Sequence, residues 1–183
     1  MAPRGNAMST TLTRDEPTSL LRIYLRDHDA AGSGGLRLIR RCRRSNTGSP
    51  FGPQLADVER AIEADRVDLE RILRQLDVSP SRLRRAVAWT GATVGVLKLN
   101  GRVASYSPLS RVVELEALAS AVQAKARLWE TLTSIAPAHR NLDLDVLTRL
   151  TLGADRQLET LADLHQRAVA AAFRTIDSAT SET

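Results

Sequence analysis

The stretch PQLADVERAIEADRVDLERILRQL, residues 53–76, decides the fold of this chain. Seven of its positions recur at intervals of three and four residues, and all but one are apolar: Leu55, Val58, Ile62, Asp65, Leu69, Ile72 and Leu76. Because an α-helix turns once every ~3.6 residues, this spacing places all seven side chains on one face. The stretch is therefore predicted to be an amphipathic helix with Asp65 on its inward face.

The same periodicity predicts three more long helices, at about 17–44, 109–135 and 142–176. The predicted inward face of the first helix consists of Leu21, Tyr24, His28, Ala31, Gly35, Leu38 and Cys42. Several of these residues are small or polar, where the other helices have leucine. No segment alternates apolar and polar residues as a half-buried strand does. The sequence therefore predicts an all-α protein.

Two short turns and one long connection predict how these helices are arranged. The turns SNTGSPFGP (45–53) and APAHRN (136–141) are rich in turn-forming residues, so each is expected to join two antiparallel helices into a hairpin. The connection at about 79–105 has a helical pattern and is long enough to return along the bundle. This is the arrangement of a ferritin-like antiparallel four-helix bundle, two hairpins with a helical crossover segment.

Length and composition favour one domain in the cytoplasm. The 183 residues fit a single bundle domain at 17–176, with disordered tails expected at 1–16 and 177–183. The one cysteine, Cys42, cannot form an internal disulfide. No apolar run approaches the ~20 residues of a membrane span, and the N-terminus does not read as a signal peptide. A cytoplasmic location without a membrane partner is therefore expected.

The net charge of +5 raises the question of nucleic-acid binding. The basic residues are nearly all arginine, as a GC-rich genome favours, and 21 acidic residues accompany the 26 basic ones. This mixture argues against nucleic acid as a partner. Six arginines gather on the first helix, opposite its inward face: Arg22, Arg26, Arg37, Arg40, Arg41 and Arg44. We interpret them as a solvated helix face, and the alternative is a surface that binds anions.

Several segments of the chain together resemble one protein family. They are YLRDHDAAGSGGLRLIRR, SPFGPQL, RILRQLDVSPSRLRRAVAW, LKLNGR and SPLSRVVELEALASAVQAKARLWETL. From about Ser19 to Phe173 the chain resembles uncharacterised proteins of high-GC Gram-positive (actinobacterial) bacteria. The resemblance implies a ferritin-like architecture and brings no activity with it.

The sequence departs from the di-iron pattern of ferritin-like proteins. Such a site needs a Glu-x-x-His pair on each of two helices, because a spacing of three places both ligands on one helical face. None of the three histidines, His28, His139 and His165, has a glutamate three residues before it. No metal site, cofactor or catalytic residue is therefore predicted.

Polar side chains nevertheless fall on the predicted inward faces. His28, next to Tyr24, and Asp65 lie at similar distances from the first turn, and Glu116 and His165 lie at similar distances from the second. Because a buried charge is costly unless it is paired, we expect one carboxylate–imidazole pair inside each hairpin. The alternative is a reduced metal or ligand site between the helices.

Three functions remain open on the sequence alone. The leading hypothesis is a non-catalytic helical-bundle protein that acts through protein contacts or self-association, with a homodimer as one form. The second is a degenerate ferritin-like binder of a metal or a small molecule through the polar residues of the interior. The third is a binder of anions or nucleic acid through the arginines of the first helix.

Overall fold

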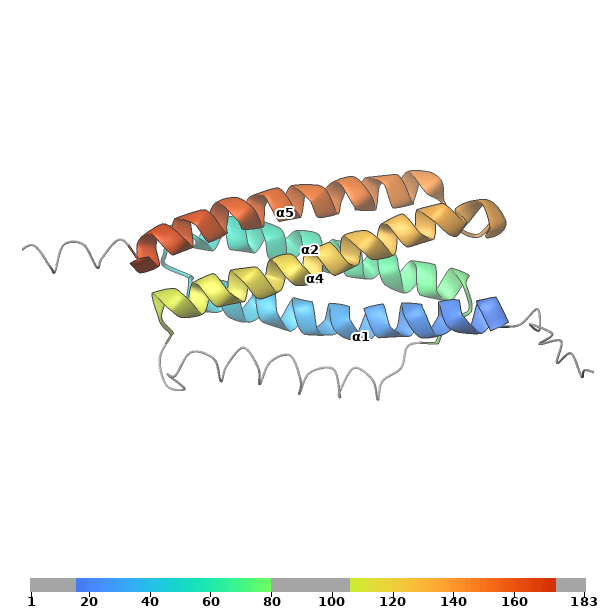
Figure 1. Cartoon of the computed structure of the whole chain (residues 1–183), viewed down its shortest axis with the longest axis horizontal. Coiled ribbons are helices and arrows are strands. Elements are labelled where there is room, and N and C mark those ends of the chain that lie inside the picture. The colour runs from blue at the N-terminus through green and yellow to red at the C-terminus, as the bar shows by residue number, and fades with distance from the viewer. Residues whose placement is uncertain (1–15, 80–105, 174–183) are drawn as a thin grey trace, which may run out of the picture.

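The computed structural model describes residues 16–79 and 106–173, and long helices make up nearly all of this part of the chain. They are α1 (Glu16–Ser45), α2 (Gly52–Gln75), α4 (Pro108–Ile135) and α5 (Leu144–Phe173), with a short 3₁₀ turn η1 (Ala136–Ala138) after α4. The described residues contain no strand. The predicted all-α class is therefore confirmed, and Figure 1 shows the four long helices packed as an elongated bundle.

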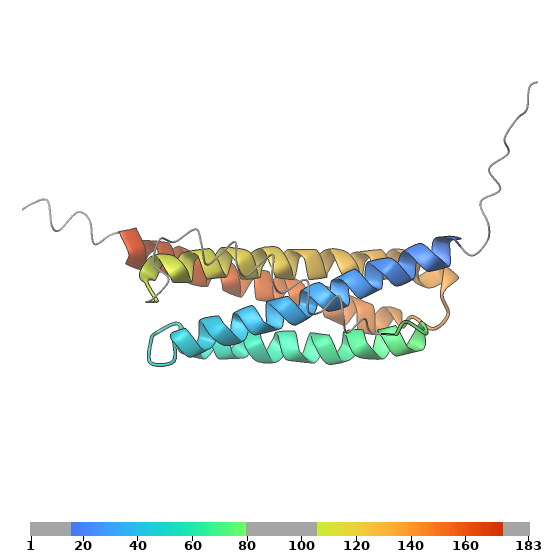
Figure 2. The ribbon, with the colours of Figure 1, turned by 90° about the horizontal axis from the view of Figure 1, so that it is seen from below.

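The four long helices form two antiparallel pairs. The short turn after Ser45 joins α1 to α2, and η1 with the residues after it joins α4 to α5. Neighbouring helices across the two pairs are α1 with α4 and α2 with α5. The end of α2 and the start of α4 lie at opposite ends of the bundle (Figure 1). Seen from below, α1 runs obliquely to the other helices (Figure 2).

Some predictions fall on residues that the structure does not describe. The predicted crossover at about 79–105 lies outside the described residues except for Ser79, and so do the predicted tail at 177–183 and residues 174–176 of the last predicted helix. The N-terminal tail was expected to reach residue 16. Glu16 is instead the first residue of α1.

Hydrogen bonds of side chains define where helix α4 begins. Ser107 precedes Pro108, its Oγ accepts a hydrogen bond from the Ser110 backbone N–H at 3.1 Å, and its own backbone N–H donates to Ser110 Oγ at 3.3 Å. Both bonds satisfy backbone or side-chain groups that the first turn of a helix leaves without partners. Proline fits the first helical position because its missing N–H has no partner there in any helix. The helix therefore begins within one residue of the predicted start at about 109.

The core is aliphatic and lies along the predicted faces of α2, α4 and α5. Leu55 and Leu69 of α2, Leu115 of α4 and Leu150 and Leu161 of α5 are all at most 5% exposed. Trp129 is fully buried among them. Burial of a leucine side chain contributes about 2 kcal/mol, so these faces hold the helices together. No described helix combines the length and the apolar run that a membrane span requires.

The buried face of α1 differs from the predicted one. Leu25 and Ile39 are fully buried, whereas Ala31 is exposed and Leu38 is only partly buried. Cys42 is fully buried as predicted, so the buried face of α1 is wider than the predicted one. The larger apolar side chains explain this choice, because burying leucine and isoleucine removes more apolar surface from water than burying alanine or glycine.

Candidate functional site

A polar layer crosses the interior of the bundle where an apolar core would be expected. Asp65 of α2 is 8% exposed, at the interior position that the spacing predicts. Its Oδ2 accepts hydrogen bonds from Lys125 Nζ of α4 and, at 2.9 Å, from Gln157 Nε2 of α5. Lys125 Nζ also donates to Gln157 Oε1 at 2.5 Å. Three helices therefore contribute to one charge-paired, hydrogen-bonded group, the Asp65–Lys125–Gln157 layer.

The partner of Asp65 is not the predicted one. The described contacts of Asp65 are with Lys125 and Gln157 and do not include His28. The His28 ring instead packs edge-on against Tyr24, with ring centroids 4.5 Å apart. Lys125 and Gln157 reach Asp65 from α4 and α5, while His28 is only partly buried on α1. The buried charged residue of α1 in this region is instead Asp29, which is 1% exposed and accepts a hydrogen bond from Arg66 of α2 at 2.9 Å.

The second predicted pair forms, but at the surface. His165 Nε2 lies 3.1 Å from Glu116 Oε1, which joins α5 to α4. The Glu116 side chain is 57% exposed and that of His165 34%. The prediction that these two residues pair is correct, and the prediction that they lie in the interior is wrong. Their position just beside the apolar stripe of each helix accounts for the error.

A cavity of about 100 Å³ lies between α1, α2 and α4, next to the polar layer. Apolar side chains form most of its wall, among them Ile62, Leu69, Leu118, Val122, Leu128 and Trp129. Asp65 and Lys125 border it, as do Arg66 and His28. A hollow with apolar walls and a few convergent polar groups is the usual form of a small-molecule site. His28 and Asp65, which the sequence analysis grouped, thus share a cavity without bonding to each other.

Burial shifts the pKa values of the basic groups at this cavity. Desolvation lowers the pKa of Lys125, while the charge of Asp65 and its hydrogen bond act in the opposite direction. Desolvation also lowers the pKa of His28, against the charge of Asp27, so neutral imidazole is favoured. Both basic groups are therefore less readily protonated than they are in water.

A second hollow lies on the other side of the polar layer, between α2 and α5. It has a volume of about 540 Å³ and is bordered by Asp65 and Gln157, with the small residues Ala61, Ala64 and Gly153 in its wall. A Cβ atom added to Gly153 would meet nothing within 4 Å. Exposed residues such as Asp57 and Arg149 also line it, so the polar layer lies between the cavity and a hollow that is open at the surface.

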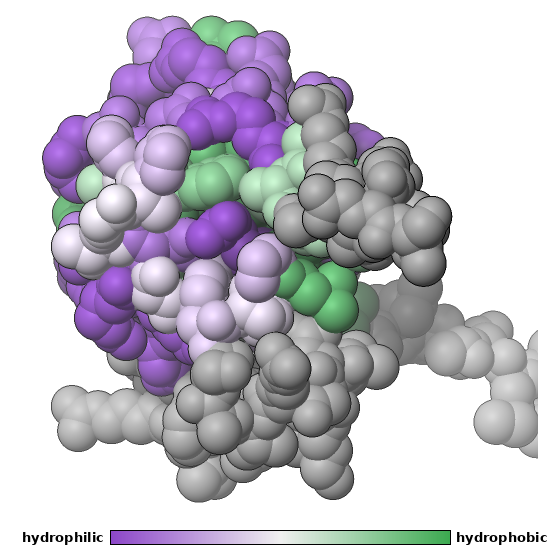
Figure 3. All heavy atoms as spheres, turned by 90° about the vertical axis from the view of Figure 1, so that its left-hand side faces the viewer, coloured by the Kyte–Doolittle hydropathy of each residue, from purple (hydrophilic) through white to green (hydrophobic). Residues whose placement is uncertain are grey.

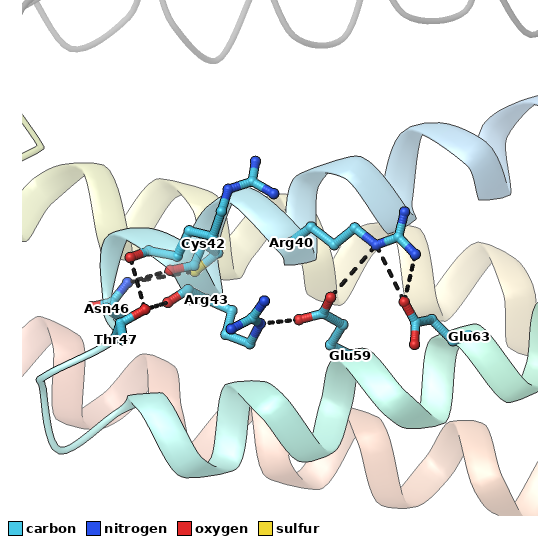
Figure 4. Close-up of polar contacts among 8 residues, drawn as sticks. Arg40, Cys42, Arg43, Asn46, Thr47, Glu59 and Glu63 are labelled. Carbon is cyan, nitrogen blue, oxygen red and sulfur yellow. Dashed lines mark hydrogen bonds and ion pairs between the residues drawn. The ribbon is translucent and has the colours of Figure 1, made fainter.

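Two arginines of the predicted basic face, Arg40 and Arg41, and the neighbouring Arg43 pair with acids of the adjacent helices. Arg40 Nη2 lies 2.5 Å from Glu63 Oε1, and Arg40 Nε lies 3.5 Å from Glu59 Oε1. Figure 4 shows Arg43 also reaching from α1 to Glu59 of α2. Ion pairing within the bundle thus neutralises part of the charge that an anion would need.

The other predicted arginines have more varied surroundings. Arg41 Nε lies 3.0 Å from Glu114 Oε1 of α4, and Arg26 Nε donates to the Ser79 carbonyl at 3.2 Å. Arg22, Arg37 and Arg44 are exposed. The structure thus brings only part of the predicted arginine group to open solvent, and the anion-binding surface stays a prediction.

A second polar cluster lies inside the end of the bundle where α1 passes into α2. Asn46 Nδ2 donates to Tyr106 Oη and to the Cys42 carbonyl, both at 2.7 Å, and Arg111 Nε donates to Asn46 Oδ1 at 2.6 Å. Burial raises the pKa of Cys42 to about 12, so its thiol stays protonated. Burial also raises the pKa of Glu114, which the charge of Arg41 opposes. Hydrophilic residues dominate the described surface at this end (Figure 3).

The sequence analysis missed Lys125 and Gln157. Lys125 is one of only two lysines, and it precedes Ala126 of the predicted inward face, while Gln157 precedes Leu158 of the inward face of α5. Both facts were available, but neither indicates that the two side chains turn inward toward Asp65.

Within residues 16–79 and 106–173, no group of three or more His, Cys, Asp or Glu side chains could hold a metal ion. No protein-family model, curated protein or solved structure matches this chain significantly.

Proposed function

We propose that this chain is a helical-bundle protein that binds a small organic molecule in the cavity between α1, α2 and α4. The single observation that carries the proposal is the cavity itself, which combines apolar walls with the buried Lys125–Asp65 ion pair. Close packing is the rule in protein interiors, so an unfilled space beside a charged group needs an explanation. A bound molecule that completes the packing provides one.

The charge arrangement favours an organic ligand over a metal ion. A cation would compete with the Lys125 ammonium group for the Asp65 carboxylate, and it would find no second carboxylate among the described residues that line the cavity. The size of the cavity restricts the ligand as well. An apolar protein cavity of about 150 Å³ is known to hold benzene, so about 100 Å³ admits a molecule of similar or smaller size.

Ligand-observed NMR with three compact probes tests this proposal. Phenol, cyclohexanol and 2-butanone each combine an apolar body with one polar group, and at least one of them is expected to bind. The variant Ala121→Leu fills the cavity, because Ala121 borders it on α4. We expect this variant to lose the binding.

The matched control is Ala162→Leu on α5, which adds the same side chain at an exposed helical position that is not part of the cavity wall. This variant should bind the probes like the unmodified chain. Failure of all three probes to bind at millimolar concentration, or equal binding to both variants, would contradict the proposal.

Other expectations from the sequence remain proposals. Action through protein contacts and a homodimer are compatible with exposed apolar residues such as Leu20 and Leu152, 62% and 53% exposed. A solution mass of one chain would count against the homodimer. The ferritin-like crossover has the two-hairpin arrangement in its favour, and the relation to actinobacterial proteins stays a prediction. The cytoplasmic location is likewise retained as a prediction.

A further inference from the structure

Lys125 is an unusual lysine for its surroundings. Its side chain is 17% exposed, and it borders the cavity between α1, α2 and α4. An ammonium group has three N–H donors, and the described residues supply Nζ with two acceptors, Asp65 Oδ2 and Gln157 Oε1. A lysine with a free donor position in an apolar cavity resembles the amines that proteins use as nucleophiles.

The charged groups around the cavity place the Lys125 amine in reach of a carboxylate, and Asp65 itself favours the ammonium form. Asp65 and Arg66 come from α2, and Arg66 is held by Asp29 at 2.9 Å and lies 3.4 Å from Glu70. His28 comes from α1, and its pKa is lowered by burial. Burial likewise lowers the pKa of Lys125, which increases the fraction of amine able to attack. Asp65 is the group placed to take the proton.

We propose that Lys125 captures a small aldehyde or ketone in this cavity as a Schiff base, an inference that rests on the proposed small-molecule function. Asp65 takes one proton from the Lys125 ammonium, and the neutral Nζ forms a bond to the carbonyl carbon. The resulting carbinolamine accepts the proton back from Asp65 on its oxygen and loses water. The product is a protonated imine, so one ammonium and one carbonyl compound yield one iminium and one water.

The Lys125–Asp65 ion pair favours a carbonyl compound at this site over an acylating compound or a carboxylate ligand. The iminium keeps the positive charge next to Asp65, whereas acylation of Nζ would remove it and leave the carboxylate buried without a counter-ion. A carboxylate ligand would meet the negative charge of Asp65 at the same nitrogen. The apolar wall favours a short hydrocarbon chain on the carbonyl carbon.

Reductive trapping with butanal tests the inference on the full-length chain. The protein is incubated briefly with butanal and cyanoborohydride at pH 7, and butylation of each lysine is measured by peptide mass spectrometry. The second lysine, Lys98, serves as the reference within the same molecule. Because burial lowers the pKa of Lys125, more of its amine is neutral, and Lys125 is expected to react faster than Lys98.

Unfolding in urea provides the control, since both lysines should then react at similar rates. A native ratio of Lys125 to Lys98 butylation no higher than the ratio in urea would overturn the inference. The variant Lys125→Arg keeps the charge next to Asp65 and lacks the amine, so it should trap no butanal at this position. Probe binding without preferential trapping would reject the Schiff base alone, and loss of both would reject the small-molecule function too.

Discussion

Asp65 shows at the scale of a residue how an interior charge is tolerated. It occupies a position where the α2 pattern otherwise places apolar side chains, and it is 8% exposed. Lys125 balances its charge, and Gln157 satisfies both partners with one amide group. A buried ion pair of this kind adds little stability compared with an apolar core, but removing one partner leaves the other uncompensated.

The variant Lys125→Met should therefore be strongly destabilised. We expect the free energy of unfolding at pH 7 to fall by about 3 kcal/mol, as measured by urea denaturation.

Arg127→Met on the same helix is the control, since Arg127 is exposed and pairs with Glu130 three residues away. This substitution should change stability little. A Lys125→Met protein as stable as the Arg127→Met protein would show that Asp65 does not depend on Lys125.

At the scale of an element, α4 depends on the hydrogen bonds at its start. Ser107 caps its first turn, whereas the residue before α2, Phe51, makes no side-chain cap. The capping pair Ser107–Ser110 lies close to the polar cluster of Asn46 and Tyr106, so the start of α4 also positions that cluster. The helix signals in this region were readable from the sequence because capping is a local interaction.

Two serine substitutions in α4 should therefore have opposite signs. Ser107→Ala removes the cap and is expected to destabilise the protein by about 1 kcal/mol. Ser120→Ala, at an exposed position in the middle of the helix, should stabilise it by a few tenths of a kcal/mol, because alanine has the higher helix propensity. Thermal and urea unfolding of both variants measure the difference, and an equal effect of the two would exclude a capping role.

At the scale of the whole molecule, two hairpins share one core. Polar groups interrupt this core at two positions along the bundle. One is the Asp65–Lys125–Gln157 layer, and the other is the cluster at the end of the bundle that includes Cys42. Both require defined protonation states, so the stability of the bundle depends on pH.

Stability should fall in alkaline solution because Cys42 must remain a thiol. Its pKa is raised from 9.0 to about 12 in the folded state. Between these values the folded chain binds more protons than the unfolded chain, so the free energy of unfolding falls as pH rises. The contribution of Cys42 is complete below pH 9 and is lost progressively toward pH 12, by up to ~1.4 kcal/mol per pH unit.

The variant Cys42→Ala lacks this dependence. The difference in unfolding free energy between the unmodified chain and the variant should therefore shrink by about 1 kcal/mol between pH 9 and pH 10. Urea denaturation at both pH values measures it. A constant difference would mean that the thiol is not protected from ionisation in the folded protein.

The sequence by itself determined the helices, the turns between them and the interior position of Asp65. Periodicity is a local property, and a stripe as regular as that of α2 has one amphipathic solution. Start signals such as Ser107 and Pro108 and the turn residues after Ser45 act within a few positions of the chain. The pairing of Glu116 with His165 also followed from equal distances along one hairpin.

Only the tertiary structure decided which polar groups meet. Asp29 is buried and pairs with Arg66, whereas the neighbouring His28 is only partly buried, although both residues belong to one short stretch. Lys125 and Gln157 reach Asp65 from α4 and α5, 60 and 92 positions away along the chain. Such contacts depend on how whole helices pack and on the reach of long side chains, and periodicity along the chain encodes neither.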